Sequence, residues 1–212
     1  MASFVLRKRE LLHDVIFPIF EANPLLTKKY HDFVELKCAY TILISEKLTK
    51  VEKDREMLAV VERLRAASIN AKLSPVWNLK CEFTQFMSKA WIIGFVEAEG
   101  SFYISKKGTN KDGTSRMSHA FGISQKEDGI VLEGVRKILG IKAKVRYKDK
   151  HHYYLLDTTN RRAIENICDY FDGFLKTNKA LEFRIWKRSF VKAYDYKRLL
   201  AAQNTLRRIR SV

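Results

Sequence analysis

Two glutamates and a glycine at the end of an apolar segment are the residues best suited to metal chemistry. Residues 91–96 are apolar and are followed by Glu97-Ala98-Glu99-Gly100. The segment predicts a helix, which Gly100 can end in a left-handed conformation. Carboxylates at a helix C-terminus are electrostatically disfavoured, so this pair suggests a function. Because Mg²⁺ prefers one or two carboxylates together with water and phosphate oxygens, the pair predicts a divalent-metal site.

Small residues on the same helix predict a helix partner. Gly94 and Ala98 are four residues apart and therefore lie on one helical face. Small side chains at this spacing allow a second helix to approach closely. We therefore expect the segment to pack against a helix of its own kind.

The nine residues 92–100 (Ile-Ile-Gly-Phe-Val-Glu-Ala-Glu-Gly) resemble the LAGLIDADG motif position for position, and residues 101–104 resemble that family's first strand. The resemblance covers residues 3 to about 195. It implies an α+β fold of αββαββα units with a curved antiparallel DNA-binding sheet. It makes Glu99 the metal-binding acid, with help from the Gly100 carbonyl, and gives Glu97 a capping and packing role. The alternative is a core helix with two surface glutamates.

The resemblance also implies two further catalytic residues. Residues 121–126 resemble a family segment that brings a polar residue beside the scissile phosphate, and this assigns Gln125. Lys176 and Lys179 lie in the turn before the last long helix, where the family often places a basic residue. We assign Lys179, and a phosphate-binding surface lysine is the alternative for both.

Basic residues alternate along residues 141–150. Every even position is Lys or Arg. A strand would place all of them on one face, suited to the phosphates of a nucleic acid, because its side chains alternate between faces. The alternative is an edge strand that carries lysines against aggregation.

Two earlier segments, residues 100–107 and 116–125, alternate in the same way. Phe102, Ile104, Met117, Phe121 and Ile123 mark the buried parity, and His119 interrupts it. Residues of the other parity could reach bases or phosphates in the major groove. The predicted DNA-binding residues are Tyr103, Ser105, Lys107, Arg116, Ser118, Gly122, Ser124, Lys144, Arg146 and Lys148.

The chain contains an internal repeat. Phe20-Glu21, Leu26-Thr27-Lys28-Lys29, Asp32-Phe33 and Leu36-Lys37 recur as Phe171-Asp172, Lys176-Thr177-Asn178-Lys179, Glu182-Phe183 and Trp186-Lys187. Each copy predicts a strand, helix, turn and helix, with strands at residues 4–6 and 153–156. Between the copies, residues 50–67 predict an amphipathic helix whose apolar residues include Val51, Leu58, Val61 and Leu64.

These segments predict one complete unit and the back half of another. Residues 1–67 form the remnant of a first unit with its connecting helix, and residues 68–85 form a linker. Residues 86–200 form the complete second unit, and residues 201–212 form a basic C-terminal tail.

Composition points to a polyanionic partner. The 212 residues include 40 Lys and Arg against 24 Asp and Glu, a formal net charge of +16. Nucleic acid is the commonest such partner, and a chain kept soluble by charge is the alternative. Three cysteines without a C-x-x-C pair argue against a disulfide framework or zinc cluster. The longest apolar run, residues 90–96, is far shorter than the roughly 20 residues of a membrane span, so we expect no membrane partner.

The resemblance implies cleavage of both strands of a long DNA site with Mg²⁺ or another divalent cation. The motif occurs once, so we expect part of a homing endonuclease, inactive alone, that needs a missing N-terminal part or a second LAGLIDADG polypeptide. One alternative is a maturase-like protein that binds intron RNA and assists group I splicing, and another is a homodimeric endonuclease. The family also implies a mitochondrial or other organellar location.

Overall fold

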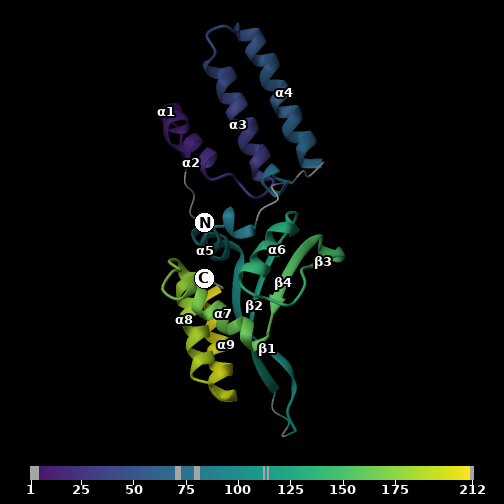
Figure 1. The fold of residues 1–212 in the computed structure, drawn as a ribbon, viewed down its shortest axis with the longest axis vertical. Helices are drawn as coiled ribbons and strands as arrows, with labels where there is room; N and C mark the ends of the chain where they lie inside the picture. Colours follow the sequence, from purple (N-terminus) through teal and green to yellow (C-terminus); the bar gives the residue numbers. More distant parts are fainter. Residues whose placement is uncertain (1–4, 70–72, 79–81, 112, 114, 211–212) are drawn as a thin grey trace. The chain divides into compact units, whose positions relative to one another are not determined.

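The computed structural model describes residues 5–69, 73–78, 82–111, 113 and 115–210. The chain divides into two compact units, residues 1–81 and residues 82–212. Each unit has its own set of elements (Figure 1). Within the described ranges, no helix combines the length and the apolar character that crossing a membrane would need.

The first unit is helical. Its elements are α1 (Arg9–Leu11), a π-helical turn (Leu12–Ile16), α2 (Phe17–Ala22), α3 (Lys29–Ile44), α4 (Lys50–Ile69) and a 3₁₀ turn (Pro75–Asn78). Phe33 packs edge-on against both Phe17 and Phe20, which joins α2 to α3. The Trp77 indole N–H donates to the Leu26 carbonyl at 2.7 Å. The strand predicted at residues 4–6 is not observed for Val5 and Leu6, and Phe4 lies outside the described residues.

Helix α4 forms as predicted, but its apolar stripe does not pack against another described helix of the first unit. Val51 is 78% exposed and Leu58 is 65% exposed, whereas Val60 is buried. The reason is that α3 approaches the other side of α4, where Arg63 makes a two-pronged ion pair with Glu35 at 2.9–3.0 Å. The hydrophobic pattern therefore predicted the helix correctly and its buried face wrongly.

The second unit contains the sheet. Its elements are a 3₁₀ turn (Phe83–Gln85), α5 (Lys89–Glu99), β1 (Gly100–Thr109), β2 (Ser115–Gln125), α6 (Gly129–Ile138), β3 (Arg146–Lys148), a 3₁₀ turn (Asp149–His151), β4 (Tyr153–Thr158), α7 (Arg161–Phe171), α8 (Asn178–Val191) and α9 (Tyr196–Arg210). The antiparallel strands lie in the order β1-β2-β4-β3. Helices α7, α8 and α9 gather on one side of them (Figure 1). The αββαββα order and the α+β class are confirmed.

The core of this unit is an aromatic cluster between the sheet and the helices. Phe102 is fully buried and lies opposite Phe121 in the β1–β2 register. Its ring centroid lies 5.1 Å from that of Phe183, 5.3 Å from Trp186 and 6.0 Å from Phe171. The predicted inward parity of Phe102, Ile104, Phe121 and Ile123 is thus confirmed. Alternation along the strands carries these rings to one face.

Helices α8 and α9 are fastened to β1 through its backbone. Three consecutive carbonyls, of Phe102, Tyr103 and Ile104, accept hydrogen bonds from Arg210 (2.6 Å), Trp186 (3.0 Å) and Gln203 (2.6 Å) respectively. Residues 201–210, expected as a tail, therefore belong to a packed helix. A hydrogen bond to a buried carbonyl also satisfies a group that would be costly to leave unpaired.

The strand predicted over residues 141–150 is mostly absent. Only Arg146–Lys148 pair with β4, and Asp149–His151 form a 3₁₀ turn. The Ile141 N–H donates to the Arg136 carbonyl at 2.9 Å, and Ile141 is 2% exposed. Residues 141–145 therefore close the end of α6 and cannot extend the sheet. Lys142 and Lys144 lie in this loop, not on a strand face.

The helix pair of the internal repeat is confirmed by matching side-chain contacts in the two copies, whereas the strand predicted in front of the first copy is not observed. In both, a threonine hydroxyl accepts from the backbone N–H two residues later, at the start of the long helix. Both also contain a Lys–acid ion pair in the first turn of that helix and a second ion pair from the helix to the preceding one. The pairs are Lys29–Asp32 and Lys37–Glu21 in the first copy, and Lys179–Glu182 and Lys187–Asp172 in the second.

His119, which interrupts the buried parity, predicts a pH dependence of stability. It lies between Trp186 and Phe190, with Nε2 2.7 Å from the Ser189 hydroxyl, and burial lowers its pKa to about 4. An unfolded histidine binds a proton near pH 6.5, so stability should fall as pH drops from 6.5 to 4. After allowance for partial exposure, we expect a loss of about 1–2 kcal/mol.

Denaturant unfolding at pH 7 and pH 4.5 would measure this loss. Because carboxylates also titrate in this range, the comparison is with His119→Gln, which cannot titrate. The variant should lose less stability on acidification than the parent. Equal losses would show that His119 does not set this dependence.

Candidate metal and nucleic-acid site

Glu97 is a structural carboxylate that caps another helix. Its oxygens accept from the backbone N–H groups of Lys176 and Thr177 and from the Thr177 hydroxyl. Thr177 is the N-cap of α8, so this carboxylate faces the positive end of the helix dipole. The contact ties the end of α5 to the start of α8.

Glu99, two residues later, is an exposed carboxylate at the last position of α5. Within the described part of the chain it has no hydrogen bond or ion pair. Burial does not explain its presence, and the helix dipole is unfavourable there. Its two oxygens are therefore available to an added cation.

Gly100 is the first residue of β1 and follows α5 directly. A glycine is required here because there is no room for a Cβ, and its backbone conformation is one that any residue adopts. Its φ of −77° and ψ of 154° are extended, so the predicted left-handed conformation is wrong. A Cβ here would lie 2.7 Å from the Val96 carbonyl oxygen and 2.6 Å from Val96 Cγ1. Because real Cβ atoms essentially never come so close, any side chain would push the strand from the helix.

The metal-ligand set in this unit is small. The described residues contain no group of three or more His, Cys, Asp or Glu side chains able to hold a metal ion. Glu99 and the Gly100 carbonyl supply oxygen ligands, which suit Mg²⁺ when water and phosphate oxygens complete the shell. These few donors therefore suit a metal ion that protein and nucleic acid hold jointly. They are too few for a structural site in which the protein alone supplies all ligands.

The structure distinguishes the two lysines near α8. Lys179 Nζ lies 3.3 Å from Glu182, and these side chains are 14% and 6% exposed. Glu182 also accepts from Arg210 Nε at 3.1 Å. Lys179 is therefore held in a mostly buried ionic network. Lys176 is exposed, and its backbone N–H bonds to Glu97, so it lies beside the end of α5.

Gln125 is the last residue of β2. It lies opposite Tyr154 in the β2–β4 register, on the same side of the strand as Phe121 and Ile123. Its parity is therefore the one that faces the helices. Because Gln125 lies at the end of the strand, its side chain is only partly buried. Its neighbour Ser124 has the opposite parity, the one predicted to face DNA.

The predicted DNA-facing residues that lie on strands share one face of the sheet, whereas Lys144 lies in a loop. Register pairs place Tyr103 opposite Ala120, Ser105 opposite Ser118 and Ser124 opposite Leu155, which itself lies opposite Arg146. Directly paired residues point to the same side. Gly122 lies on this face but is not free to contact DNA, because it is buried beneath the Tyr103 ring. A Cβ on Gly122 would lie 3.2 Å from Cε1 of that ring. Burial raises the pKa of Tyr103, so its hydroxyl stays protonated.

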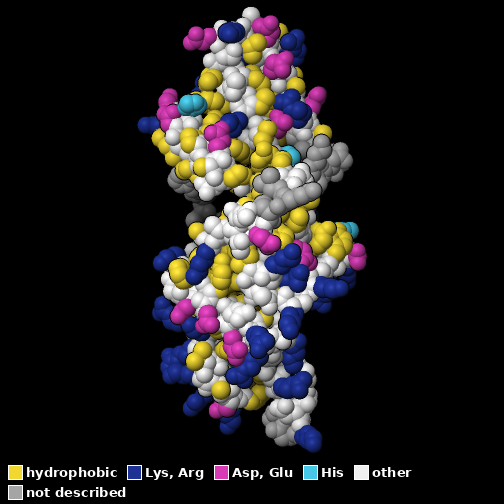
Figure 2. Space-filling model, in the orientation of Figure 1, with side chains coloured by type: hydrophobic (Ala, Val, Ile, Leu, Met, Phe, Trp, Pro, Cys, Tyr) yellow, Lys and Arg dark blue, Asp and Glu magenta, His cyan; other side chains and the backbone are white. Residues whose placement is uncertain are grey.

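Basic side chains gather at one end of this face. Lys107, Lys142, Lys144 and Arg146 line a hollow of about 610 Å³ with Asp157 and residues 158–160. Arg146 is paired with Asp157 at 2.6 Å. Lys142 and Lys144 thus reach the face from the loop despite the missing strand. Figure 2 shows that Lys and Arg side chains are dense over the sheet-bearing unit. Asp157 was not predicted, since a single acid in a strand carries no pattern.

The motif helix leaves one face open. Ile92 and Val96 are fully buried on the sheet side. Gly94 and Ala98 are exposed, and a Cβ on Gly94 would meet nothing within 4 Å in the part of the chain that the structure describes. The small-residue face predicted from the spacing therefore has room for a second helix.

The two glutamates should respond differently to removal. Glu97→Ala removes the cap of α8 and should lower the free energy of unfolding by about 1 kcal/mol, within a range of about 0.5–2. Glu99→Ala is the matched control and should change it by less than about 0.5 kcal/mol. Chemical denaturation of both variants gives the comparison. A larger loss for Glu99→Ala than for Glu97→Ala would contradict these roles.

Comparison with known proteins agrees with the geometry. The family described as "LAGLIDADG endonuclease" matches residues 92–190. The "Probable intron-encoded endonuclease Cox1-I1b" of Schizosaccharomyces pombe is 35% identical over 211 residues, 97% of this chain and 51% of that protein. The chain thus spans about half the length of this curated relative.

Two solved structures share the fold. "I-SmaMI bound to uncleaved DNA target in the presence of Calcium ions" has a TM-score of 0.74 at 19% identity, covering 97% of this chain and 74% of that chain. The "I-LtrWI LAGLIDADG homing endonuclease bound to target DNA" has a TM-score of 0.73 at 21% identity, covering 95% and 73%. These two matches show the fold. The family match at residues 92–190 and the curated relative, which aligns with 97% of the chain, show that the chain belongs to the LAGLIDADG endonuclease family.

Proposed function

We propose that this chain is part of a homing endonuclease that cuts duplex DNA with the help of divalent cations. The observation that carries the proposal is the exposed Glu99 carboxylate at the point where α5 passes into β1, a strand of the sheet that also carries several cations on one face. A carboxylate without a partner would repel a DNA phosphate. A bound cation reverses that effect, because it attracts both groups.

Each residue has a distinct task in this proposal. Glu99 and the Gly100 carbonyl would hold a divalent cation, and such a cation would supply activation of water and charge stabilisation of the leaving 3′ oxygen. Lys176, exposed beside the end of α5, supplies positive charge near the reacting phosphate, and it replaces Lys179, which is held by Glu182. Gln125 orients water or phosphate from the end of β2. Glu97 fixes the end of α5 against the start of α8 through its hydrogen bonds to Thr177.

The sheet face binds the DNA. An antiparallel ribbon fits the major groove, and cations at its end neutralise phosphates. The solved relatives named above are bound to their target DNA, and one was studied with calcium ions. For this chain, we assign base contacts to Tyr103, Ser105, Ser118 and Ser124. Phosphate contacts fall to Lys107, Arg116, Lys144, Arg146 and Lys148.

Double-strand cleavage needs a second motif helix. One Glu99 supplies one acid, whereas two strands must be cut, and the Gly94–Ala98 face of α5 is open to a like helix. A second LAGLIDADG helix on that face would place a second acid beside the first. It could come from another part of the same protein or from another polypeptide.

We propose that the protein acts in an organelle whose genes contain introns that encode LAGLIDADG endonucleases. The S. pombe relative is named as intron-encoded. A protein of that type acts on DNA in the compartment where its intron is transcribed, and family resemblance points to mitochondria.

Glu99→Gln should abolish metal-dependent cleavage by the assembled protein and leave DNA affinity equal or higher, because a neutral amide neither holds the cation nor repels phosphate. The assay measures nicking and linearisation of a plasmid carrying the uninterrupted host site, with Mg²⁺ or EDTA. Glu165→Gln, an exposed acid on α7, controls for the loss of one charge. Cleavage by Glu99→Gln at the parental rate would exclude Glu99 as the metal acid.

The triple variant Lys144→Ala, Arg146→Ala and Lys148→Ala should weaken duplex binding and flatten its salt dependence. The log–log slope should change by up to about 0.9 for each phosphate that these cations no longer neutralise. The matched control removes three exposed cations of the helical layer, Arg161, Arg162 and Lys197. Arg161 is paired with Glu165, as Arg146 is with Asp157, so both variants break one ion pair. An unchanged slope in the first variant would show that this part of the sheet does not face DNA.

A further inference from the structure

Asp157 is an acidic residue on the predicted DNA-facing side of the sheet. Its register partner is Gly122, so its side chain lies on the same side as that of Ser124. It is the one Asp or Glu among the residues of the four strands that the structure describes. Because a carboxylate repels the phosphates that neighbouring lysines and arginines attract, it lowers the general affinity for a duplex. Its presence on this side therefore needs a more specific explanation.

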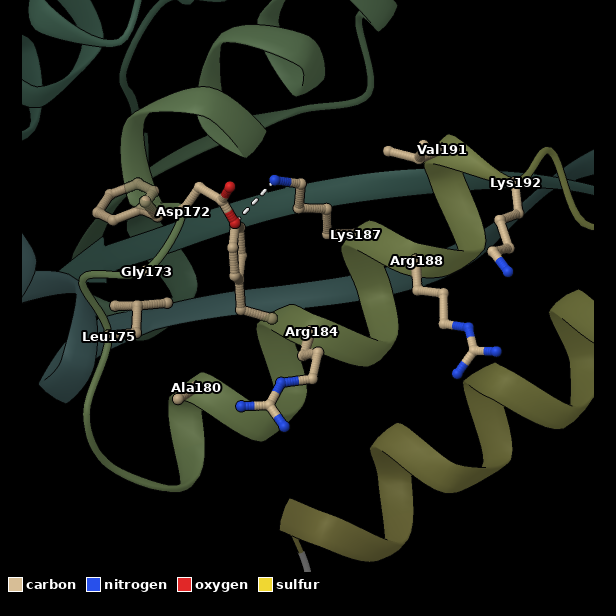
Figure 3. A pocket seen from close by; sticks show the side chains of 11 residues that line it. Asp172, Gly173, Leu175, Ala180, Arg184, Lys187, Arg188, Val191 and Lys192 are labelled. Atoms are coloured by element: carbon tan, nitrogen blue, oxygen red, sulfur yellow. Dashed lines mark ion pairs between the residues drawn. The ribbon is translucent and has the colours of Figure 1, made fainter.

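The packing of the helices explains another acid of this unit but does not explain Asp157. Asp172 pairs with Lys187 at 2.8 Å beside a hollow on the helical side (Figure 3), and a matching ion pair joins the corresponding helices of the first unit. Asp157 pairs instead with Arg146 of β3, and these two side chains are 34% and 53% exposed. Partly exposed ion pairs contribute little to stability, so folding alone does not require this one.

Arg146 occupies only one of the two oxygens of the Asp157 carboxylate. Its Nη2 donates to Oδ1 at 2.6 Å, and Oδ2 accepts no hydrogen bond from the residues that the structure describes. The guanidinium offsets the charge of the carboxylate and thereby lowers the cost of bringing it close to DNA. The hydrogen bond also restricts the rotation of the side chain. Oδ2 is therefore a positioned acceptor on the predicted DNA-facing side.

Tyr103 places a hydroxyl donor beside this acceptor. A Cβ on Gly122 would lie 3.5 Å from the Tyr103 hydroxyl oxygen and 3.7 Å from Asp157 Cβ, so both side chains border the space that the glycine leaves empty. Burial and then the charge of Asp157 raise the pKa of Tyr103, so the hydroxyl keeps its proton and can donate. Within the described ranges this hydroxyl makes no hydrogen bond of its own. One donor and one acceptor thus lie side by side on this face.

We propose that Asp157 and Tyr103 recognise one C·G base pair in the major groove, with the carboxylate accepting from the cytosine amino group and the hydroxyl donating to guanine. This inference rests on the proposed function, because it takes the outer face of the sheet as the DNA-binding side. Cytosine presents its N4 amino group as a donor in the major groove, and guanine presents N7 and O6 as acceptors.

The other bases fit the carboxylate less well than cytosine does. Thymine and guanine would place an acceptor oxygen against Asp157 Oδ2, which is repulsive. Adenine offers an amino group, but its N7 acceptor lies next to that group and disfavours a carboxylate. Cytosine has only a C–H group in that place. An isolated carboxylate acceptor therefore favours cytosine over the three other bases.

The test selects bound molecules from a randomised DNA duplex library with the full 212-residue chain in EDTA, and sequences them. Asp157→Asn should change the preferred base at one position from cytosine to adenine, because an amide pairs with both N6 and N7 of adenine. The ratio of the two affinities should shift by about tenfold, and the other positions should stay as in the parent. Asp157→Ala should accept all four bases there. Thermal unfolding of Asp157→Asn should match the parent, because the carboxylate is partly exposed.

Two controls separate base recognition from the orientation of Arg146 and from charge. Arg146→Gln removes a phosphate contact, so it should weaken binding to all sequences alike and retain the preference for cytosine. Asp169→Asn removes one exposed acid of α7 and should leave the preference as in the parent. An equal loss of the cytosine preference in Arg146→Gln and Asp157→Asn would overturn the inference, because Asp157 would then act only by orienting Arg146.

The remaining outcomes separate this inference from the proposed function. Duplex binding in which Asp157→Asn has the parental preference, or in which the parent has none, would overturn the inference and leave the proposed endonuclease surface intact. A parental preference for adenine at the position that Asp157→Asn alters would overturn the choice of cytosine. Failure of the parent to bind any duplex would overturn both the inference and the proposed surface.

Discussion

The junction between α5 and β1 constrains the whole sheet-bearing unit. Helix and strand follow each other without a loop, since α5 ends at Glu99 and β1 begins at Gly100. This direct passage is possible only because Gly100 has no Cβ to strike the Val96 carbonyl. The junction delivers Phe102 to the core and exposes Glu99 at the same time. Both the aromatic packing and the candidate metal site depend on that one close approach.

The two glutamates before this junction divide the work between structure and chemistry. They are two residues apart, so they leave the helix in nearly opposite directions. Glu97 meets the N-terminus of α8, where backbone N–H groups and a threonine hydroxyl hold it. Glu99 meets solvent. A carboxylate that is already satisfied cannot hold a cation well, whereas an unsatisfied one gains by doing so. The capping contact thus explains why only one of the pair is suited to be a metal ligand.

Charge in this protein is arranged on two surfaces with a helical layer between them. One is the outer face of the sheet, where Lys107, Arg146 and the loop lysines converge. The other is the outer side of α8, where four cations line an apolar hollow and one of them, Lys187, is paired with Asp172. The first unit preserves the helix pair, its cap and its ion pair without the α8 cations.

Local patterns were enough to predict much of this protein, and the tertiary structure decided the rest. The motif at residues 92–100, the parity of β1 and β2, and the repeated helix pair follow from spacing, because side-chain direction is fixed by helix and strand geometry. The buried face of α4, the loop at residues 141–145 and the ionic network around Lys179 did not follow. The first and the third depend on contacts between segments far apart in the sequence, α3 with α4 and Arg210 with Glu182. The loop depends on a local contact that competes with strand pairing, since the Ile141 N–H bonds to the Arg136 carbonyl at the end of α6. The sequence alone determined which side chains could carry chemistry, and only the tertiary contacts decided which were already satisfied and which stayed free to act.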